Sequence, residues 1–490
     1  MTRILPSQQR FTTRAILLPS ILLIQAISHL TLLHPSAHSG QLAIPWLLNQ
    51  GLMLFDQVVE QHAPGGSLLV ALFQQLLPLP PLTTVQLLNL ILVLSMSLLI
   101  YVLTFQLEGR HAAVFALIFW TIWEPVYNNI LFYYDALVGL CLILATIIWL
   151  RLRYHDRSFI APMLVGLVLG GGTLFKQHGW ISVGLFGTWL VWNERNRIFP
   201  YLFGVLLLPV ICVIFFAIQG HLEAYLYWNW TYNLAGLMPT GEFSGGFLRK
   251  LLFTAILGLS YVVLVLRMKG PERSVRILVL LMGLGGTTTL IPRGDEYHVM
   301  GVLPIVSVIS GSVLSWIIPS KKELSDWLQT GDPKTSILYG IMGVVALAWS
   351  LTIVAPYFGP KTTPAHDEFL PLAQELRTIS QPGDTLFVLP ETDSTPQIHL
   401  LTEMLPPGLW VKGWAWYFEA PGVTERLLNE WTQSPPDYVV IFPDLLGAGA
   451  PGIVPLVEFV NAKYAQVGDV INVDYHGPAV IYQYLDTVRP

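Results

Sequence analysis

Charged residues are scarce in this chain. Asp, Glu, Lys and Arg make up 12% of the 490 residues, whereas 53% are hydrophobic. Soluble domains carry roughly 25% charged residues, so this is the composition of a membrane protein. The net charge of −5 gives no basic excess, and nothing points to nucleic acid as a partner.

Cysteine is almost absent as well. Cys141 and Cys212 both lie inside apolar runs, which predicts two core side chains and neither a disulfide nor a metal pair. No glycine-rich phosphate loop follows either of the strands expected near the C-terminus, so no nucleotide site is predicted. No internal repeat stands out. No histidine, aspartate or glutamate spacing is a strong metal motif, so no metal site is assigned, although a divalent ion stays possible.

Long apolar runs fill most of the chain. A membrane helix needs roughly 20 apolar residues, and about a dozen such runs occur. We expect an uncleaved first span over residues 13–33 with the N-terminus in the cytoplasm, and arginine-rich inner loops near residues 151–157, 194–197 and 267–276. The alternation of sides fails only between residues 66 and 150, where four runs join an outer loop to an inner one. One run is therefore re-entrant or wrongly divided, and the total is 11 or 13 spans.

The last quarter has a different character. Charges rise after residue 357 and long apolar runs stop. Residues 385–389 and 438–442 predict buried strands, and residues 366–378 and 423–431 predict amphipathic helices. The fold class expected is a mainly α, polytopic membrane bundle over residues 1–357, followed by an extracytoplasmic α/β domain over residues 358–490.

The segment 34–66 has no Lys or Arg, which predicts a loop on the outer side. Residues 41–55 predict a short interfacial helix. Asp56 follows, with Glu60 one helical turn later and then His62. By the expected topology, other polar residues reach the same side: Asp135, Lys176, His178, Arg293, Asp295, Glu296 and His298.

Acids and bases from separate segments could thus meet in one cavity, as a transferase with a lipid phosphate donor requires. A carboxylate takes a proton from an acceptor, and basic residues stabilise the leaving phosphate. Each residue also has a structural interpretation. Asp56 could cap a helix, Lys176 could be an interfacial lysine, and Asp135 could be a hydrogen-bonded buried acid. Glu60 and His62 could be solvated, and Arg293 and His298 could pair with the neighbouring acids.

Four motifs together resemble a known family. They are Gly51-Leu-Met-Leu-Phe-Asp56 with Gln61-His-Ala-Pro64, Tyr133-Tyr-Asp135, Gly171-Gly-Thr-Leu-Phe-Lys-Gln177, and Arg293…His298…Pro304. The chain is similar in these to membrane glycosyltransferases of the GT-C class, family 39, which includes protein mannosyltransferase-like and bacterial aminoarabinose transferase-like enzymes. The protein mannosyltransferases of this family carry an adjacent Asp-Glu pair in the first outer loop. This chain departs from that pattern, because Gln57 follows Asp56.

The resemblance implies an inverting glycosyltransferase in the bacterial inner membrane. It would move a sugar from a polyprenyl-phosphate donor to an extracytoplasmic glycan, lipid or protein. Asp56 is the implied catalytic base, and the implied substrate-binding residues are Glu60, His62, Asp135, Lys176, His178, Arg293 and His298. The sugar, the acceptor and the oligomeric state stay open.

Two other functions are compatible with parts of the sequence. A transporter or flippase of lipid-linked glycans predicts charges deep in many spans and repeated halves, but Asp135 is the one candidate charge and no repeat is found. A non-catalytic glycan-binding relative predicts a binding face at residues 410–417, for which packing against the membrane domain is preferred. The aromatic segment 225–232 is expected to form an interfacial belt.

Overall fold

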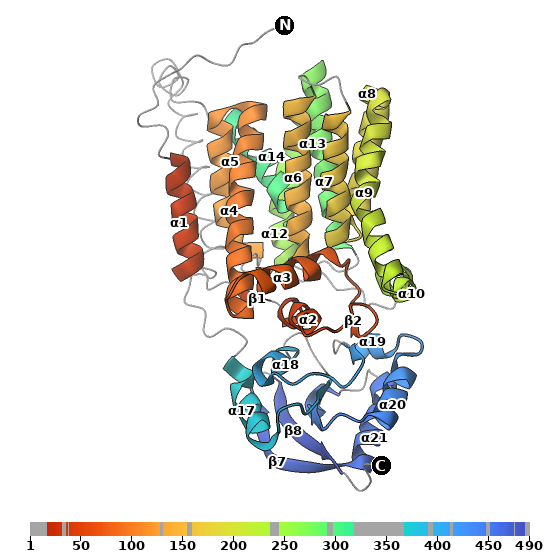
Figure 1. The fold of residues 1–490 in the computed structure, drawn as a ribbon. Coiled ribbons are helices and arrows are strands. Elements are labelled where there is room, and N and C mark those ends of the chain that lie inside the picture. The colour runs from red at the N-terminus through yellow and green to blue at the C-terminus, as the bar shows by residue number, and fades with distance from the viewer. Residues whose placement is uncertain are drawn as a thin grey trace.

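A column of helices with a smaller part at one end makes up the computed structural model (Figure 1). It describes residues 17–31, 36–37, 39–127, 131–153, 159–235, 245–291, 297–317, 367–390, 395–411, 415–446, 451–474 and 476–485. Below, "the bundle" means the described residues up to 317 and "the α/β part" those from 367. The domain boundary predicted after residue 357 and the run at residues 337–357 lie outside the described residues.

The long helices of the bundle run side by side along its axis (Figure 1). Among the described residues, three stretches are long and apolar enough to cross a membrane: Pro81–Glu108, Tyr134–Leu152 and Gly179–Ile218. The helices are α1 (Leu17–Thr31), α4 (Pro81–Glu108), α5 (Arg110–Trp123), α6 (Tyr134–Leu152), α7 (Ile160–Phe175), α8 (Gly179–Glu194), α9 (Ile198–Ile218), α12 (Gly245–Arg267), α13 (Pro271–Thr287) and α14 (Leu303–Ile317).

Two shorter helices, α2 (Ser39–Asn49) and α3 (Gly65–Leu76), lie across the end of the column and not along it (Figure 1). The helix expected over residues 41–55 is therefore present but starts and ends earlier. Because α3 lies across the bundle, only α4, α5 and α6 run lengthwise between the outer loop and the arginines after residue 150. Three is an odd number, as the charge pattern requires.

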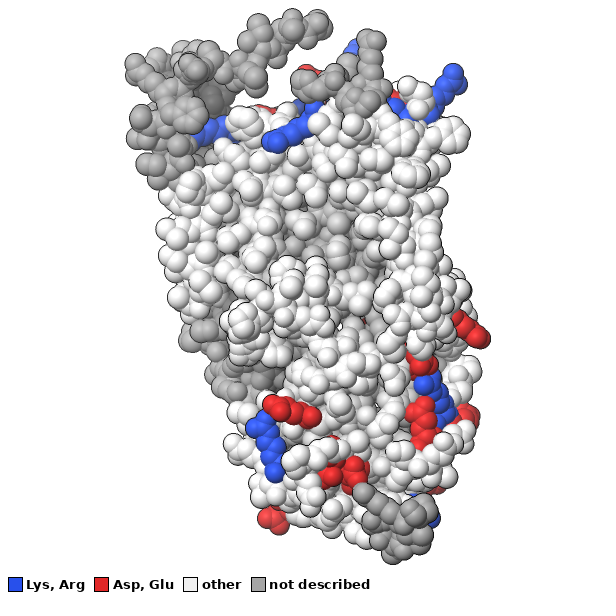
Figure 2. Space-filling model, viewed as in Figure 1, with Lys and Arg blue, Asp and Glu red and all other residues white. Residues whose placement is uncertain are grey.

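Charge is distributed unevenly along the molecule. On the face shown in Figure 2, Lys and Arg gather at the end of the bundle remote from the α/β part, and the middle of the bundle surface carries almost no charge. Asp and Glu gather on and near the α/β part. Helix α9 fits this uncharged zone, because large hydrophobic side chains such as Phe203, Ile211 and Phe215 are exposed along it.

The α/β part contains a four-stranded sheet in the order β4-β6-β8-β7. Strands β4 and β6 are parallel, and the other pairs are antiparallel. The predicted strands and helices of this region are confirmed within a few residues. The elements are α17 (Leu370–Ile379), β4 (Leu386–Leu389), α18 (Gln397–Thr402), β5 (Trp410–Val411), α19 (Ala415–Phe418), α20 (Val423–Gln433), β6 (Tyr438–Ile441), α21 (Val454–Lys463), β7 (Tyr464–Val473) and β8 (Gly477–Tyr484).

The first outer loop pairs with the α/β part through its backbone. Strand β2 (Val58–Val59) lies parallel to β5, and the amide of Trp410 donates to the carbonyl of Gln57 at 2.7 Å. The same loop contributes Phe55, which is 1% exposed and has a φ of 71°. A left-handed aromatic residue is strained, so packing of its ring has to hold it in place. That packing comes from Phe216 and Tyr225, whose ring centroids lie 5.2 and 5.4 Å away.

The aromatic segment after α9 packs at the same junction. It forms α10 (Leu222–Leu226), a π-helical turn over residues 227–231 and α11 (Tyr232–Leu234). Tyr225, Trp228 and Tyr232 are buried, and the ring of Tyr232 stacks on Tyr417 of the α/β part at 5.6 Å. The prediction of an interfacial belt is therefore wrong for these side chains. Burial of Trp410 and Tyr417 agrees instead with the packing role preferred for residues 410–417, of which residues 412–414 lie outside the described residues.

Candidate functional site

A buried ion pair lies where α6 begins and α7 ends. The Nζ atom of Lys176 donates to both carboxylate oxygens of Asp135, at 2.8 and 2.9 Å. Lys176 is 4% exposed and Asp135 is fully buried. Asp135 stands in the first turn of α6, where the helix dipole favours a negative charge. A lysine ammonium has three N–H groups, so one remains for a further acceptor beyond the two bonds to Asp135.

A second acid–base pair comes from the first outer loop. The carboxylate of Glu60 accepts hydrogen bonds from the ring Nδ1 of His62 at 2.5 Å and from its backbone amide at 2.9 Å. Glu60 is 2% exposed. The carbonyl of Gln61 accepts from Gln177 at 2.8 Å and from Asn233 at 2.9 Å, so the loop is fastened to the turn after α7.

The ring of Tyr133 joins these two pairs. It lies 6.0 Å from the Nζ atom of Lys176, 6.4 Å from the ring of His62 and 5.7 Å from the ring of His298. His298 belongs to the 3₁₀ turn Tyr297–Gly301 and is 8% exposed. We call the set Glu60, His62, Asp135, Lys176 and His298 the buried polar cluster.

The α/β part reaches the cluster through Tyr417. Burial raises the pKa of Tyr417 well above its usual range, and the negative charge of Glu60 raises it further. The phenol therefore stays protonated and can donate a hydrogen bond beside Glu60. The buried polar cluster is thus covered by the second part of the chain.

His178 lies in the turn between α7 and α8, beside the cluster. Burial, and after it the positive charge of Lys176, lowers the pKa of His178 to about 4. Its Nδ1 atom has no hydrogen-bond partner among the described residues. The imidazole is neutral at neutral pH and can accept a hydrogen bond there.

This pKa predicts a loss of stability in acid. Between about pH 6.5 and the folded pKa, the unfolded chain binds a proton that the folded chain does not, so stability falls as pH is lowered through that window. The contribution of His178 amounts to at most about 3 kcal/mol. We expect His178→Asn to show a smaller drop in melting temperature than the wild type between about pH 7.5 and about pH 5, measured in lipid nanodiscs. Parallel pH curves for the two proteins would contradict it.

Two glycines allow the loop to approach the cluster. Tyr134 donates to or accepts from the hydroxyl of Ser67 at 2.9 Å, and a Cβ atom on Gly66 would overlap the ring of Tyr134. A Cβ atom on Gly65 would stand 2.6 Å from the carbonyl oxygen of Leu174. Close approach of α3 to α6 and α7 therefore requires both glycines.

Replacing Gly66 with Ala should push Tyr134 aside. We expect a loss of about 1–3 kcal/mol in stability, as for other overpacked cores. The matched control is Gly184→Ala in α8, where an added Cβ meets nothing within 4 Å. That change should stabilise the helix by roughly 0.5–1 kcal/mol. Thermal unfolding of both variants measures the difference, and a neutral Gly66→Ala would refute the close contact.

The ion-pair partners of Asp56 are residues outside the buried polar cluster. Its carboxylate pairs with the guanidinium of Arg426 at 3.2 Å and with the ring of His221 at 3.6 Å, and its side chain is 33% exposed. Arg426 belongs to α20 and also pairs with Glu430 at 2.8 Å. Sequence reasoning missed Arg426 and His221, since neither lies in a motif. The structure thus brings together five of the predicted residues and places Asp56 at the exposed edge of the same loop.

The remaining predicted features have varied outcomes. Arg293 lies outside the described residues, as do Asp295 and Glu296. The sequence Asn229-Trp-Thr231 also matches the Asn-X-Thr pattern of glycosylation acceptors, but Asn229 is 2% exposed and accepts a hydrogen bond from Gln177, so its side chain is not accessible for that modification. Within the described parts of the chain, no three His, Cys, Asp or Glu side chains are grouped to hold a metal ion.

No protein-family model matches this sequence, and no curated protein does. Several solved structures share its fold. ArnT from Cupriavidus metallidurans bound to undecaprenyl phosphate is 13% identical, with a TM-score of 0.62 over 98% of this chain and 99% of its own. The oligosaccharyltransferase AglB from Archaeoglobus fulgidus, in complex with an inhibitory peptide and a dolichol-phosphate, is 12% identical, with a TM-score of 0.59 over 98% of this chain and 75% of its own.

A third similar structure is the mycobacterial arabinofuranosyltransferase AftD, at 14% identity and a TM-score of 0.53 over 98% of this chain and 42% of its own. At these identities the likeness concerns the fold. It confirms the prediction from the sequence: the chain has the GT-C membrane fold, with a small sheet-containing part at its C-terminal end.

Proposed function

We propose that this protein is an integral membrane glycosyltransferase that moves a sugar from a polyprenyl-phosphate donor to an extracytoplasmic acceptor. The observation that carries the proposal is the buried polar cluster, which holds a lysine, two carboxylates and histidines at one end of a GT-C bundle. Buried charges at a membrane edge are costly, and their usual justification is function. The cluster offers a cation for a phosphate, and the outer loop that supplies Glu60 and His62 to it also carries the partly exposed carboxylate of Asp56, which can accept a proton.

The donor class follows from the similar structures. AglB was solved with a dolichol-phosphate and ArnT with undecaprenyl phosphate, which are both polyprenyl phosphates. The AglB structure also holds an inhibitory peptide.

The proposed orientation puts the N-terminus in the cytoplasm and the α/β part outside. Lys and Arg gather at the end remote from the α/β part, as the positive-inside rule expects for the cytoplasmic end (Figure 2). The cluster then lies near the outer face of a bacterial inner membrane, where the lipid tail of the donor can enter between helices. With α3 across the bundle, the proposed number of spans is the lower of the two predicted, 11.

In the proposed reaction the acceptor hydroxyl or amine attacks the anomeric carbon of the donor. A new bond from the acceptor atom to this carbon forms while its bond to the phosphate oxygen breaks. Asp56 takes the proton of the acceptor, because its partly exposed carboxylate is reachable from water. The free N–H of Lys176 and the neighbouring His298 hold the leaving polyprenyl phosphate. Glu60 orients His62, and His178 lines the site.

The test is consumption of donor. Purified protein in lipid nanodiscs is incubated with a panel of polyprenyl-phosphate sugars and with candidate acceptors, and released polyprenyl phosphate is measured. Release that depends on the protein and on one donor of the panel supports the proposal. A parallel incubation with EDTA asks whether a divalent ion takes part. Donor translocation between leaflets without any release would instead support a flippase.

A further inference from the structure

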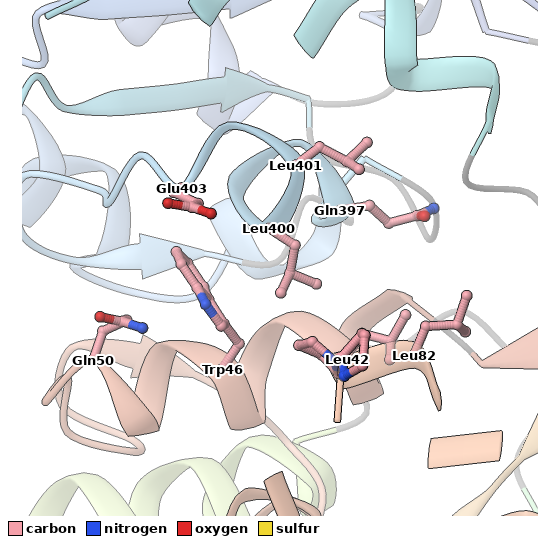
Figure 3. Close-up of a pocket in the computed structure, with 10 residues that line it drawn as sticks. Leu42, Trp46, Gln50, Leu82, Gln397, Leu400, Leu401 and Glu403 are labelled. Atoms are coloured by element: carbon pink, nitrogen blue, oxygen red, sulfur yellow. The ribbon is translucent and has the colours of Figure 1, made fainter. Parts of the chain in front are cut away.

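A cavity lies between the bundle and the α/β part, and its described lining contains no residue of the buried polar cluster. Its volume is about 580 Å³, within the range of small-molecule sites. Helix α2 forms one wall and helix α18 the opposite wall, and the corner before α4 closes one side (Figure 3). Its described lining residues include none of the residues to which a catalytic or donor-binding role is proposed above.

The walls of the cavity differ in chemistry. Leu42, Leu82 and Leu400 supply apolar surface. Trp46 stands on α2, and Gln50 directly follows the last residue of that helix, with its amide donating to the carbonyl of Trp46 at 3.0 Å. The half-buried indole of Trp46 points from α2 toward Glu403 at the end of α18 (Figure 3).

Among the described residues that line the cavity, Glu403 is the one charged side chain. Its φ is 61°, and among the described residues only Phe55 is another non-glycine with a left-handed φ. This position directly after α18 normally favours glycine or asparagine, so a glutamate is held there against its backbone preference. Within the described chain, the Glu403 carboxylate makes no hydrogen bond or ion pair. A strained, exposed and uncommitted acid at the rim of a cavity indicates a ligand-binding role.

We propose that this cavity binds a neutral sugar ring. A pyranose has one face of C–H groups, which suits the indole of Trp46, and a rim of hydroxyls, which suits Gln50 and Glu403. An alkyl chain would remove water from the Glu403 carboxylate without replacing its hydrogen bonds, which is costly. An anionic sugar would be repelled by the same charge.

The site goes beyond the proposed transfer chemistry. The assignment of the bound sugar to a glycan acceptor rests on the proposed glycosyltransferase function. The acceptor would be held beside the loop that carries Asp56, since α2 leads into that loop after Gln50. Sugar binding is measured without turnover and should persist in Asp56→Asn. Failure of the sugar site and failure of the glycosyltransferase proposal are therefore separate results.

The experiment is saturation-transfer NMR with the full-length protein in lipid nanodiscs, which avoids sugar-based detergents. The probes are methyl glucopyranoside and its uronate, which differ in charge. We expect the wild type to bind the neutral probe and not the uronate. Trp46→Ala should weaken binding roughly tenfold, as loss of an aromatic contact does, and Trp46→Phe should retain most of it. The matched control Trp192→Ala removes an exposed indole at the end of α8 and should change nothing.

Charge selection gives an independent readout. Glu403→Gln should admit the uronate, whereas Glu458→Gln, on an exposed position of α21, should not. The proposal is overturned if the wild type gives no signal with the neutral probe, or if Trp46→Ala binds it as well as the wild type does. It is also overturned if octanol binds in a Trp46-dependent manner and the sugar does not, because the occupant would then be an alkyl chain.

Discussion

Replacing Lys176 with methionine should lower stability and turnover together, and both by a large amount. The substitution leaves the fully buried carboxylate of Asp135 without its two charge-assisted hydrogen bonds. Breaking a buried ion pair from one side typically costs about 3–5 kcal/mol. Loss of a group that stabilises a leaving phosphate costs about 10²–10³ in rate. Thermal unfolding and release of polyprenyl phosphate, both in nanodiscs, measure the two effects.

A double variant separates them. Lys176→Met combined with Asp135→Leu replaces the buried pair with apolar groups, which is often neutral for stability. Its stability should therefore recover toward that of the wild type, while turnover stays low. If the double variant is as unstable as Lys176→Met, the unpaired carboxylate of Asp135 is not the cause of the lost stability. Wild-type turnover in Lys176→Met would remove Lys176 from phosphate binding.

Replacing Asp56 with asparagine should abolish most turnover and spare the fold. A general base contributes about 10²–10⁴ to the rate. The Asp56–Arg426 pair is partly exposed, with side chains 33% and 42% accessible, and such pairs contribute only about 0–1 kcal/mol. Asp56→Asn should thus unfold near the wild-type temperature and still bind donor, while donor consumption falls by at least about a hundredfold.

Glu60→Gln is the matched comparison for this prediction, because it removes the other carboxylate of the loop from a buried position. An amide can still accept a hydrogen bond from His62, so we expect a smaller loss of turnover than in Asp56→Asn. The reverse order, with Asp56→Asn active and Glu60→Gln inactive, would assign the proton transfer to Glu60. The two variants therefore identify which acid acts as the base.

Local pattern was enough to predict most of the elements. The helix predicted over residues 423–431 coincides with α20, and the strand predicted over 438–442 contains β6, since hydrophobic length and periodicity depend on neighbouring residues alone. The same pattern could not place α3. Its twelve residues are as apolar as a short membrane span. A helix that spans the membrane and a helix that lies across the end of the bundle have the same sequence pattern, and only packing against the other helices distinguishes them.

The contacts of the site could be predicted only in part. The sequence correctly grouped Asp135, Lys176 and His298 through their expected positions at one end of the bundle. It could not predict that Lys176 pairs with Asp135, or that Arg426 faces Asp56 from 370 residues away. The residues around an arginine on an amphipathic helix do not indicate which distant acid it pairs with. Such pairs depend on how the α/β part docks, which is a property of the whole chain.

The pairing of β2 with β5 has a consequence for the order in which the protein is built. Strand β2 leaves the ribosome early, but the strand that pairs with it follows about 350 residues later. At about 5–20 residues per second, translation of that interval takes roughly 20–70 seconds. Throughout this time the loop that carries Asp56 lacks its backbone partner. A nascent chain can therefore form its helices before the loop that carries Asp56 gains its partner strand, and a truncation before Trp410 would leave that loop unpaired.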